Sequence, residues 1–402
     1  MYNYIKESDV AQSYLEKIGY YTCGGKIFYS KINALFHSNS TGQPVDWTFN
    51  DSVFSKLDWT KEPEQSLNEL YDQRARHIRE SYDYVVLSYS GGADSHNILC
   101  SFVRQNLKID EIIVNHSLDG SKSITNLNVN DTRAENSNAE IPLQAIPRLK
   151  ELENKLAGTV ITLVDVTHSL IDYFDKQTSG EWIENKREGI NPAGITRFNY
   201  EIFEKIARTF DSQKKIAFVL GIDKPKTLIK DGKFYMRFND RAANVVAVTD
   251  NLLKHSNVQV EYFYWSADSA QLLIKQAHVV KKWLEASPQY IKFWDYSTTT
   301  FKSVRTVHER LLRSVVYSTW DDNWFQVDKP VLDWHCEFDN WFFRDFKDTK
   351  SFHVWNEGVQ YLQKNLENYL RYEDDQLCPN GLRLFTKSYF VGDMAPVTQI
   401  IR

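Results

Sequence analysis

Short apolar runs and segments of helical periodicity alternate along roughly the first half of the chain. The runs that predict strands are 84–89, 111–115, 159–165 and 215–220. The segments that predict helices between them are 95–107, 142–156 and 199–210. Nearly continuous apolar runs are typical of strands buried on both faces of a parallel sheet, which right-handed crossovers would connect. The pattern therefore predicts an α/β fold, with a parallel twisted sheet and helices on both faces.

Local signals add further elements around this sheet. A helix is predicted over 66–82, where Ser66 and Glu69 have the spacing of a capping box. The run 227–236 is divided by Asp231-Gly232, which predicts a β-hairpin with a type I′ turn. Two later elements are predicted, a strand at 258–264 and an amphipathic helix at 268–286.

The remaining segments have weaker patterns. Residues 24–36 predict a short strand followed by a helix, and the turn residues of 41–51 predict a loop. The polar, Asn-rich segment 119–141 predicts a long loop or flap. After about residue 290 the pattern is irregular and rich in aromatic residues, and we expect an aromatic-rich α/β C-terminal region.

Composition narrows the class of protein. The chain has 402 residues, 42% hydrophobic and 25% charged, which is an ordinary globular balance. The formal net charge of −5 makes non-specific nucleic-acid binding an unfavoured interpretation. The sequence has no run of 18 apolar residues, and its first ten residues lack the apolar core of a signal peptide, so we expect no membrane span and a cytoplasmic protein. The four cysteines form no C-x-x-C pair, which indicates free thiols rather than a zinc or iron–sulfur site.

The strand 84–89 ends in the sequence Ser-Gly-Gly-Ala-Asp-Ser at residues 90–95. Ligands of open parallel sheets bind at the carboxyl ends of the strands. Gly91 and Gly92 let the backbone approach a ligand, and the amides of the turn and of the following helix would converge on an anion. Asp94 would repel a bare phosphate, but it fits a site in which Mg2+ lies between the two. These residues predict a pyrophosphate cradle; a turn with a Ser/Asp cap and no ligand would explain the glycines and one cap residue only.

The sequence SGGADS resembles the S-G-G-x-D-S loop of the N-type ATP pyrophosphatases, the PP-loop superfamily. The resemblance covers about residues 80–255 and implies an adenine nucleotide alpha hydrolase-like, Rossmann-like fold, with ATP and Mg2+ as cofactors. The segment GIDKPK, residues 221–226, resembles a second nucleotide-site segment of this superfamily. Together with LLIKQAHVVKKW, these segments are also similar to phage-encoded proteins described as asparagine synthetase-like or PAPS reductase-like.

The resemblance implies roles for individual residues. Asp94, Asp223 and Lys226 are the predicted catalytic residues, with Asp94 and Asp223 also as metal ligands and Lys226 neutralising the polyphosphate. Lys224 is a weaker candidate for the same role, and a solvated charged turn stays an alternative for residues 223–226. The predicted cofactor-binding residues are Ser88, Ser90, Gly91, Gly92, Ala93, Asp94, Ser95, Asn115, His116 and Gly221. Asn115 and His116 end the second strand, at the edge that holds adenosine in the superfamily, although a polar strand cap explains either side chain equally well.

Other polar and aromatic side chains have a structural interpretation at least as good as a functional one. Arg237 and Arg241 could clamp an anionic substrate or lie on the surface. Lys275 and His278 lie one turn apart on a predicted helix, and packing is the better interpretation for both. The later tryptophans, which could stack on a base or form core, are Trp320, Trp324, Trp334, Trp341 and Trp355.

Departures from the superfamily pattern decide between its activities. Tyr2 stands where glutamine-dependent synthetases have a cysteine, so we expect no glutaminase activity. The segment DWHCEFD around Cys336 differs from the E-C-G-x-H type of tail in PAPS reductases, and the cysteine pairs of thiolation enzymes are missing. The resemblance thus implies an AMP-forming ligase or amidotransferase-like synthetase, with an unidentified small-molecule or nucleotide substrate and ammonia or an amine as donor. The alternatives are a sulfur-transfer or PAPS reductase-like enzyme and a nucleotide-binding phage protein without turnover, which would place the chain in the host cytoplasm.

The predicted organisation has three parts. Residues 1–75 form an N-terminal segment, residues 76–255 the PP-loop ATP-binding domain, and residues 256–402 a C-terminal substrate or interaction region. The sequence leaves the oligomeric state open.

Overall fold

A computed structural model gives the structure of this chain. The residues that it describes are 17, 19–28, 30–116, 141–165, 169–183, 213–240, 257–294, 302–321, 346–366, 371–373, 376–378 and 384–395. The predicted flap 119–141 lies almost entirely outside these residues, and the predicted helix 199–210 does so completely.

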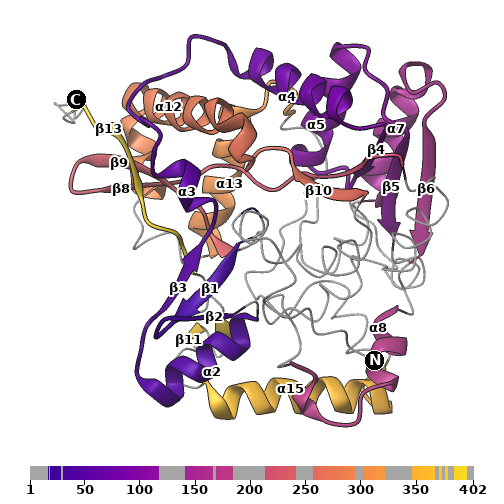
Figure 1. Cartoon of the computed structure of the whole chain (residues 1–402), viewed down its shortest axis with the longest axis vertical. Helices are drawn as coiled ribbons and strands as arrows, with labels where there is room; N and C mark the ends of the chain where they lie inside the picture. The colour runs from indigo at the N-terminus through magenta and orange to yellow at the C-terminus, as the bar shows by residue number, and fades with distance from the viewer. Residues whose placement is uncertain are drawn as a thin grey trace.

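The centre of the fold is a five-stranded parallel sheet with the strand order β10-β7-β4-β5-β6 (Figure 1). Its strands are β4 (Tyr84–Ser88), β5 (Glu111–His116), β6 (Val160–Asp165), β7 (Ile216–Leu220) and β10 (Val258–Tyr262). The chain therefore starts in the middle of the sheet, adds two strands on one side, and then two on the other. This order is Rossmann-like, and it places a topological switch point between β4 and β7. The α/β class and the parallel sheet are confirmed.

Burial along the strands follows their position in the sheet. Every residue of β7 is buried, as expected for a central strand covered on both faces. The same expectation is wrong for β6, where Val160, Ile161 and Leu163 are 55%, 43% and 54% exposed. β6 is an edge strand of the sheet, so its apolar composition does not lead to burial.

Helices α4 (Leu67–Ser81) and α5 (Ala93–Arg104) contact each other and both pack on β4 (Figure 1). The capping box of α4 is confirmed, because the Ser66 hydroxyl accepts from the Glu69 amide and the Glu69 carboxylate accepts from the Ser66 amide. The continuous helix predicted over 142–156 is wrong. It is divided into a π-helix Ile141–Ala145, α7 (Ile146–Glu151) and a 3-10 turn Glu153–Lys155. Pro142 and Pro147 interrupt it, because proline donates no backbone hydrogen bond.

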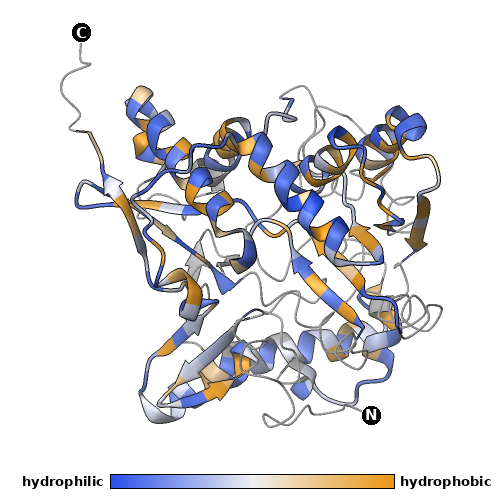
Figure 2. Ribbon diagram, turned by 45° about the horizontal axis from the view of Figure 1, so that its top comes forward, coloured by the Kyte–Doolittle hydropathy of each residue, from blue (hydrophilic) through white to orange (hydrophobic). Residues whose placement is uncertain are grey.

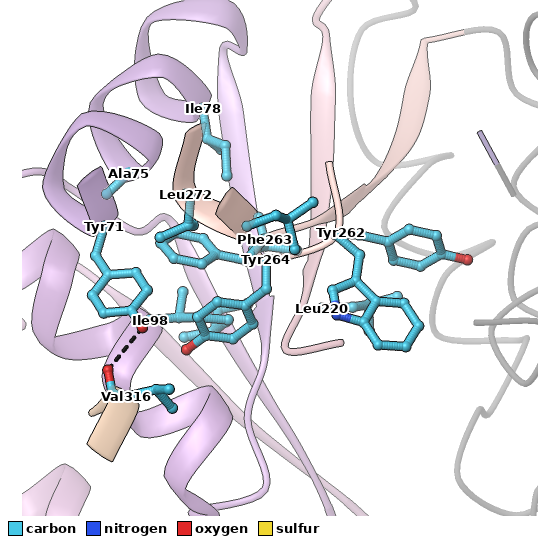
Figure 3. Close-up of a cluster of buried hydrophobic side chains, with 14 of the residues drawn as sticks. Tyr71, Ala75, Ile78, Ile98, Leu220, Tyr262, Phe263, Tyr264, Leu272 and Val316 are labelled. Atoms are coloured by element: carbon cyan, nitrogen blue, oxygen red, sulfur yellow. Dashed lines mark hydrogen bonds between the residues drawn. The ribbon is translucent and has the colours of Figure 1, made fainter. Parts of the chain in front are cut away.

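Two later helices join the core from the C-terminal part of the chain. They are α12 (Ala270–Ala286), which confirms the predicted amphipathic helix, and α13 (Lys302–Val316). Figure 3 shows Tyr71 of α4, Phe263 and Tyr264 in one apolar cluster with Val316 of α13. The Tyr71 hydroxyl donates to the Val316 carbonyl at 2.8 Å, which fixes the end of α13 against α4 (Figure 3).

The predicted hairpin is confirmed as β8 (Lys226–Lys230) and β9 (Lys233–Arg237). Asp231 and Gly232 both have positive φ angles, 52° and 71°, as a type I′ turn requires. A third strand, β13 (Tyr389–Asp393), pairs antiparallel with β9. The C-terminal region is therefore more regular than its sequence suggests, since it also contains α13 and α15 (Lys350–Asn365).

A small antiparallel sheet lies near the start of the described chain, and α2 (Lys31–Thr41) packs on it. It consists of β1 (Tyr20–Cys23), β2 (Lys26–Phe28) and β3 (Val45–Thr48). The strand and helix predicted over 24–36 are confirmed, but the loop predicted over 41–51 is wrong, because β3 lies within it. Trp47 of β3 is buried with its ring centroid 4.7 Å from that of Tyr21, so pairing with β1 and aromatic packing outweigh the turn residues before β3.

The shorter elements complete the description. They are α3 (Asp51–Phe54), α8 (Ser169–Asp175), β11 (Arg371–Glu373), β12 (Gln376–Cys378) and the 3-10 turns Gly180–Ile183, Ala267–Ser269 and Pro288–Phe293. Apolar residues follow the strands of the central sheet and one side of the helices that cover it (Figure 2). No helix in the described ranges has the length and apolar character to cross a membrane.

One hydrophobic core runs from Tyr21 to Val391. α4 passes through the predicted boundary between residues 75 and 76, and β10 of the predicted C-terminal region is the fifth strand of the central sheet. The three-part division of the chain stays a prediction.

Candidate functional site

The Ser-Gly-Gly turn follows β4 at the switch point of the sheet, next to the segment that follows β7. The two segments are in close contact. A Cβ atom on Gly221 would lie 3.2 Å from the amide nitrogen of Ser95 and 3.3 Å from Cβ of Asp94. Glycine at residue 221 therefore lets the two segments approach each other this closely.

The turn is held in shape by its own serines. The Ser90 and Gly92 amides donate to the hydroxyl oxygens of Ser95 and Ser90, each at 3.3 Å, and the Ser95 hydroxyl lies 3.2 Å from the Gly92 carbonyl. These contacts stabilise the turn without a ligand, as the structural alternative to a phosphate site requires. They also fix the backbone before α5, so the amides of the loop are already oriented.

The two glycines of the turn have different structural roles. Gly91 has a φ angle of +75°, and a Cβ atom there would lie 2.7 Å from Cα of Ala145. Gly92 is the N-cap of α5 with φ −68° and ψ 164°, a conformation open to any residue. Gly91 is therefore required by the fold, whereas the backbone at Gly92 imposes no such requirement.

The N-terminus of α5 carries positive potential. The helix has twelve residues and its N-cap Gly92 offers no side-chain hydrogen bond, so the first amides, among them those of Ala93, Asp94 and Ser95, are available to an acceptor. Arg148 of α7 is buried behind the loop and donates from Nη1 to the Gly91 carbonyl. No motif in the sequence marks Arg148 as a residue of the site.

A buried cluster of charges connects the turn, the segment after β7 and α13; we call it the Lys224 cluster. Its members are Asp94, Asp223, Lys224, Lys226 and Glu309. Nζ of Lys224 lies 2.8 Å from Oδ2 of Asp94, 3.3 Å from Oδ1 of Asp223 and 3.4 Å from Oε2 of Glu309. Nζ of Lys226 lies 3.0 Å from Oδ2 of Asp223 and 3.9 Å from Oε1 of Glu309.

Two tyrosines fix Asp94 from the other side. The Tyr317 hydroxyl, just after α13, donates to Oδ1 of Asp94 at 2.5 Å, and the Tyr264 hydroxyl donates to the Asp94 carbonyl at 2.8 Å. Burial, together with the Asp94 carboxylate, raises the pKa of Tyr317 well above its ordinary value. Both phenols are therefore neutral donors at neutral pH.

Two members of the Lys224 cluster, Lys224 and Glu309, are held in their charged forms in spite of their burial. Burial lowers the pKa of Lys224, but the carboxylates of Asp94, Asp223 and Glu309 outweigh this effect, and the pKa is raised above its ordinary value. Burial raises the pKa of Glu309, yet Lys224, Lys226 and Arg313 hold it well below its usual range. The Lys224 ammonium and the Glu309 carboxylate therefore stabilise each other at the carboxyl end of the sheet.

The structure thus brings together four residues that the sequence selected, namely Asp94, Asp223, Lys226 and Gly221. Ser88 ends β4, and Asn115 and the backbone of His116 end β5, at the same edge of the sheet; the His116 side chain lies outside the described structure. Lys224, the weaker candidate, contacts the Asp94 carboxylate directly at 2.8 Å.

The sequence analysis missed Glu309 and Tyr317. The helical spacing of Val307, Leu311 and Val315 could have predicted α13. No local signal shows which face of that helix meets the turn.

A metal ion held jointly by Asp94 and Asp223 does not fit this arrangement. The Lys224 ammonium lies between the two carboxylates, at hydrogen-bond distance from both. Among the described residues, no group of three or more His, Cys, Asp or Glu side chains is arranged to hold a metal ion. The protein-held Mg2+ therefore stays a sequence-based prediction, and no step below depends on it.

The other candidates of the sequence analysis have structural roles where they are described. Arg237 lies over the Phe385 ring, 3.7 Å from its centroid. Lys275 donates to Glu62 at 2.8 Å, and Nε2 of His278 lies 3.0 Å from the Trp59 carbonyl oxygen, so both hold the segment before α4. Trp355 is buried, and Arg313 lies over the ring of Trp320. The candidates outside the described residues are Arg241, Trp324, Trp334 and Trp341.

The cysteines whose side chains are described are free thiols, Cys23 buried and Cys100 partly exposed. Sγ of Cys100 lies 3.4 Å from Nε2 of His96, whose Nδ1 lies 3.0 Å from the Tyr89 hydroxyl. Burial raises the pKa of Cys100, and burial followed by the nearby Arg148 charge lowers the pKa of His96 to about 4. A neutral thiol beside a neutral imidazole is not an activated nucleophile.

The buried His96 gives a pH-dependent prediction. Its pKa is about 4 in the folded chain against an ordinary value of 6.5, so between these values the unfolded chain binds the proton and the folded chain does not. Acidification from pH 6.5 to pH 4 should therefore remove about 3 kcal/mol of stability through this residue. Denaturant unfolding of His96→Asn should show a smaller acid loss than the unsubstituted chain. The same substitution at the exposed His77 is the control, and equal acid loss in all three proteins would contradict the prediction.

Gly91→Ala should destabilise the chain by about 2 kcal/mol or more, because residue 91 has a positive φ angle and the new Cβ would meet the Ala145 backbone. Urea unfolding measures the loss. Gly25→Ala is the matched control, since Gly25 also has a positive φ angle, of +80°, but a Cβ there meets nothing within 4 Å. Equal losses in the two variants would show that the contact with Ala145 has no energetic weight.

The fold and this site together define a protein with an open, Rossmann-like parallel sheet and a charged loop site at its switch point. The chain matches no protein-family model, no curated protein and no solved structure.

Proposed function

We propose that the chain binds ATP at the Ser-Gly-Gly turn and cleaves it to AMP and pyrophosphate through adenylylation of a substrate oxygen. The observation that carries this proposal is the contact between SGGADS and GIDKPK, made through Asp94 and Lys224 at the switch point of the sheet. Two segments that resemble parts of one nucleotide site lie about 130 residues apart in sequence and meet in the structure.

The backbone of the turn fits a polyphosphate. The N-terminus of α5 has amide donors, Gly221 lets the segment after β7 pack closely against its first turn, and the buried Arg148 adds positive charge behind the loop. In the proposed complex, the amides of Ala93 to Ser95 hold the β- and γ-phosphates. The residues at the ends of β4 and β5, including Asn115, lie where the adenosine would bind.

Positioning and charge stabilisation are the contributions of the protein in this proposal. As pyrophosphate leaves, negative charge grows on the bridging oxygen, and the ammonium groups of Lys224 and Lys226 lie beside the turn on the side of Asp94. Asp94, Asp223 and Glu309 keep these ammonium groups in place. Ammonia or an amine would then displace AMP from the adenylylated substrate. Mg2+ belongs to the proposal as an ion carried by the phosphates of ATP, and no residue is assigned to it.

A second candidate is a nucleotide-binding protein without turnover. It is favoured by the Lys224 cluster itself, whose charges already have partners within the protein. A sulfur-transfer or reductase activity finds less support, because burial raises the pKa of Cys100 and the other described thiol, Cys23, is buried.

Product analysis distinguishes these candidates. The full chain is incubated with ATP, Mg2+, ammonium and a panel of carboxylate-containing metabolites, and AMP and pyrophosphate are quantified by phosphorus NMR. Equal amounts of AMP and pyrophosphate that depend on one of the metabolites support the ligase. ATP binding without either product supports the second candidate, and the absence of ATP binding would rule out both.

A further inference from the structure

Four carboxylate oxygens surround one lysine nitrogen at the start of α5. Nζ of Lys224 lies 2.8 and 3.2 Å from the two oxygens of Asp94, 3.3 Å from Oδ1 of Asp223 and 3.4 Å from Oε2 of Glu309. The three acidic residues come from three different elements, namely α5, the segment after β7, and α13. Lys224 is the cation at their common centre.

The Nζ atom of Lys224 is surrounded by carboxylates, as a bound cation would be. The Lys224 side chain is only 4% exposed, and those of Asp223 and Glu309 are 6% and 20% exposed. The backbone amide of Lys224 donates to Asp223 at 2.6 Å, which fixes that carboxylate, and Tyr317 fixes Asp94. Buried carboxylates of this kind require a cation, because their mutual repulsion is otherwise uncompensated.

We infer that the Lys224 ammonium is the resident cation of this three-carboxylate cage and takes the place of a divalent metal ion on Asp94. A hard divalent cation would need oxygen ligands at about 2.0–2.6 Å around the position that Nζ fills. The ammonium and the metal therefore exclude each other. A side chain of the protein, and not a bound metal ion, thus supplies the positive charge that the nucleotide site needs at the start of α5.

The inference assigns Lys224 the role of the cation beside Asp94 in the proposed ATP site, and it therefore rests on the proposed function. Its test uses no nucleotide, however, so the two can fail separately. An absence of ATP binding would overturn the proposed function and leave the occupancy of the cage to be decided by the metal alone.

The test is a titration with Mn2+, followed by electron paramagnetic resonance, of the unsubstituted chain and of Lys224→Ala. Lys224→Ala empties the centre of the cage. As they stand, no three acidic side chains of the described residues are arranged to hold a metal ion, so Asp94, Asp223 and Glu309 have to move closer together to ligate one. We expect the variant to gain one Mn2+ site at least about 10-fold tighter than any site of the unsubstituted chain. The double variant Lys224→Ala with Asp94→Asn should lose that site. Lys275→Ala is the matched control, because Lys275 also contacts a carboxylate, that of Glu62 at 2.8 Å, but lies outside the cage.

Two results would overturn the inference. One is a Mn2+ site in the unsubstituted chain that Asp94→Asn removes, since Lys224 would then not exclude the metal. The other is a folded Lys224→Ala protein that gains no site. If Lys224→Ala does not fold, Lys224→Met retains most of the packed stem and replaces it in the same titration. The comparison between the unsubstituted chain and Asp94→Asn needs neither lysine variant, and a metal site absent from both supports the inference.

Discussion

Asp94→Asn should reduce ATP-dependent AMP release at least about 100-fold and leave the chain folded. The substitution keeps the shape of the side chain and its contact with the Tyr317 hydroxyl, but it removes the charge that holds Lys224 at 2.8 Å. Lys224 would then be held only by the more distant Asp223 and Glu309, away from the turn. The loss should therefore appear in the chemical step.

AMP release under saturating ATP measures this effect, and circular dichroism shows whether the fold persists. Asp72→Asn is the matched control, because Asp72 also pairs with a cation, Arg104 at 2.7 Å, but lies between α4 and α5 outside the site. Unchanged AMP release in Asp94→Asn would remove this carboxylate from the reaction.

Arg74→Met should lower the free energy of unfolding by about 3–5 kcal/mol, the largest stability effect that we expect from one substitution of a charged residue. Arg74 of α4 is buried, and its Nη2 lies 2.6 Å from Oε2 of Glu261 on β10, with further donation to the Phe263 and Tyr262 carbonyls. Methionine fills part of the volume but leaves the buried Glu261 without its closest cation.

Urea unfolding compares this variant with Arg104→Met. The Arg104–Asp72 pair has a similar length, but its arginine side chain is 31% exposed, so we expect a loss below about 1 kcal/mol. Equal losses in the two variants would contradict the importance that we give to the burial of the Arg74–Glu261 pair.

The sequence predicted the elements that local interactions stabilise, and the strands that consist almost entirely of apolar residues. The central strands β4 and β7 are nearly pure apolar runs, and the hairpin carries Asp231-Gly232 at its tip. β6 has the same composition as a central strand, yet it is exposed, because the position of a strand in a sheet depends on strand order and not on its own residues. β3 was missed because its pairing with β1 supplies stability that no local pattern shows.

The candidate site divides in the same way. The residues of the turn and Asp223 and Lys226 were found because they lie next to strand ends and match a local motif. The contact of Lys224 with Asp94 depends on the pairing of β4 with β7, and its contact with Glu309 depends on the packing of α13; both join residues more than 80 positions apart. From the sequence, Asp94 and Asp223 were predicted to be metal ligands, whereas in the structure the Lys224 ammonium group lies between them.

The central claim is that the backbone at the start of α5 holds the phosphates of ATP, and calorimetric titration of Gly92→Val with ATP and with AMP tests it most directly. Gly92 has φ −68° and ψ 164°, a backbone conformation that valine can adopt, whereas Gly91 has a positive φ angle. The account predicts that the unsubstituted chain binds ATP more tightly than AMP, and that Gly92→Val weakens ATP binding at least about 10-fold more than AMP binding, since AMP lacks the β- and γ-phosphates. Equal weakening of both nucleotides, or no weakening of either, would contradict it.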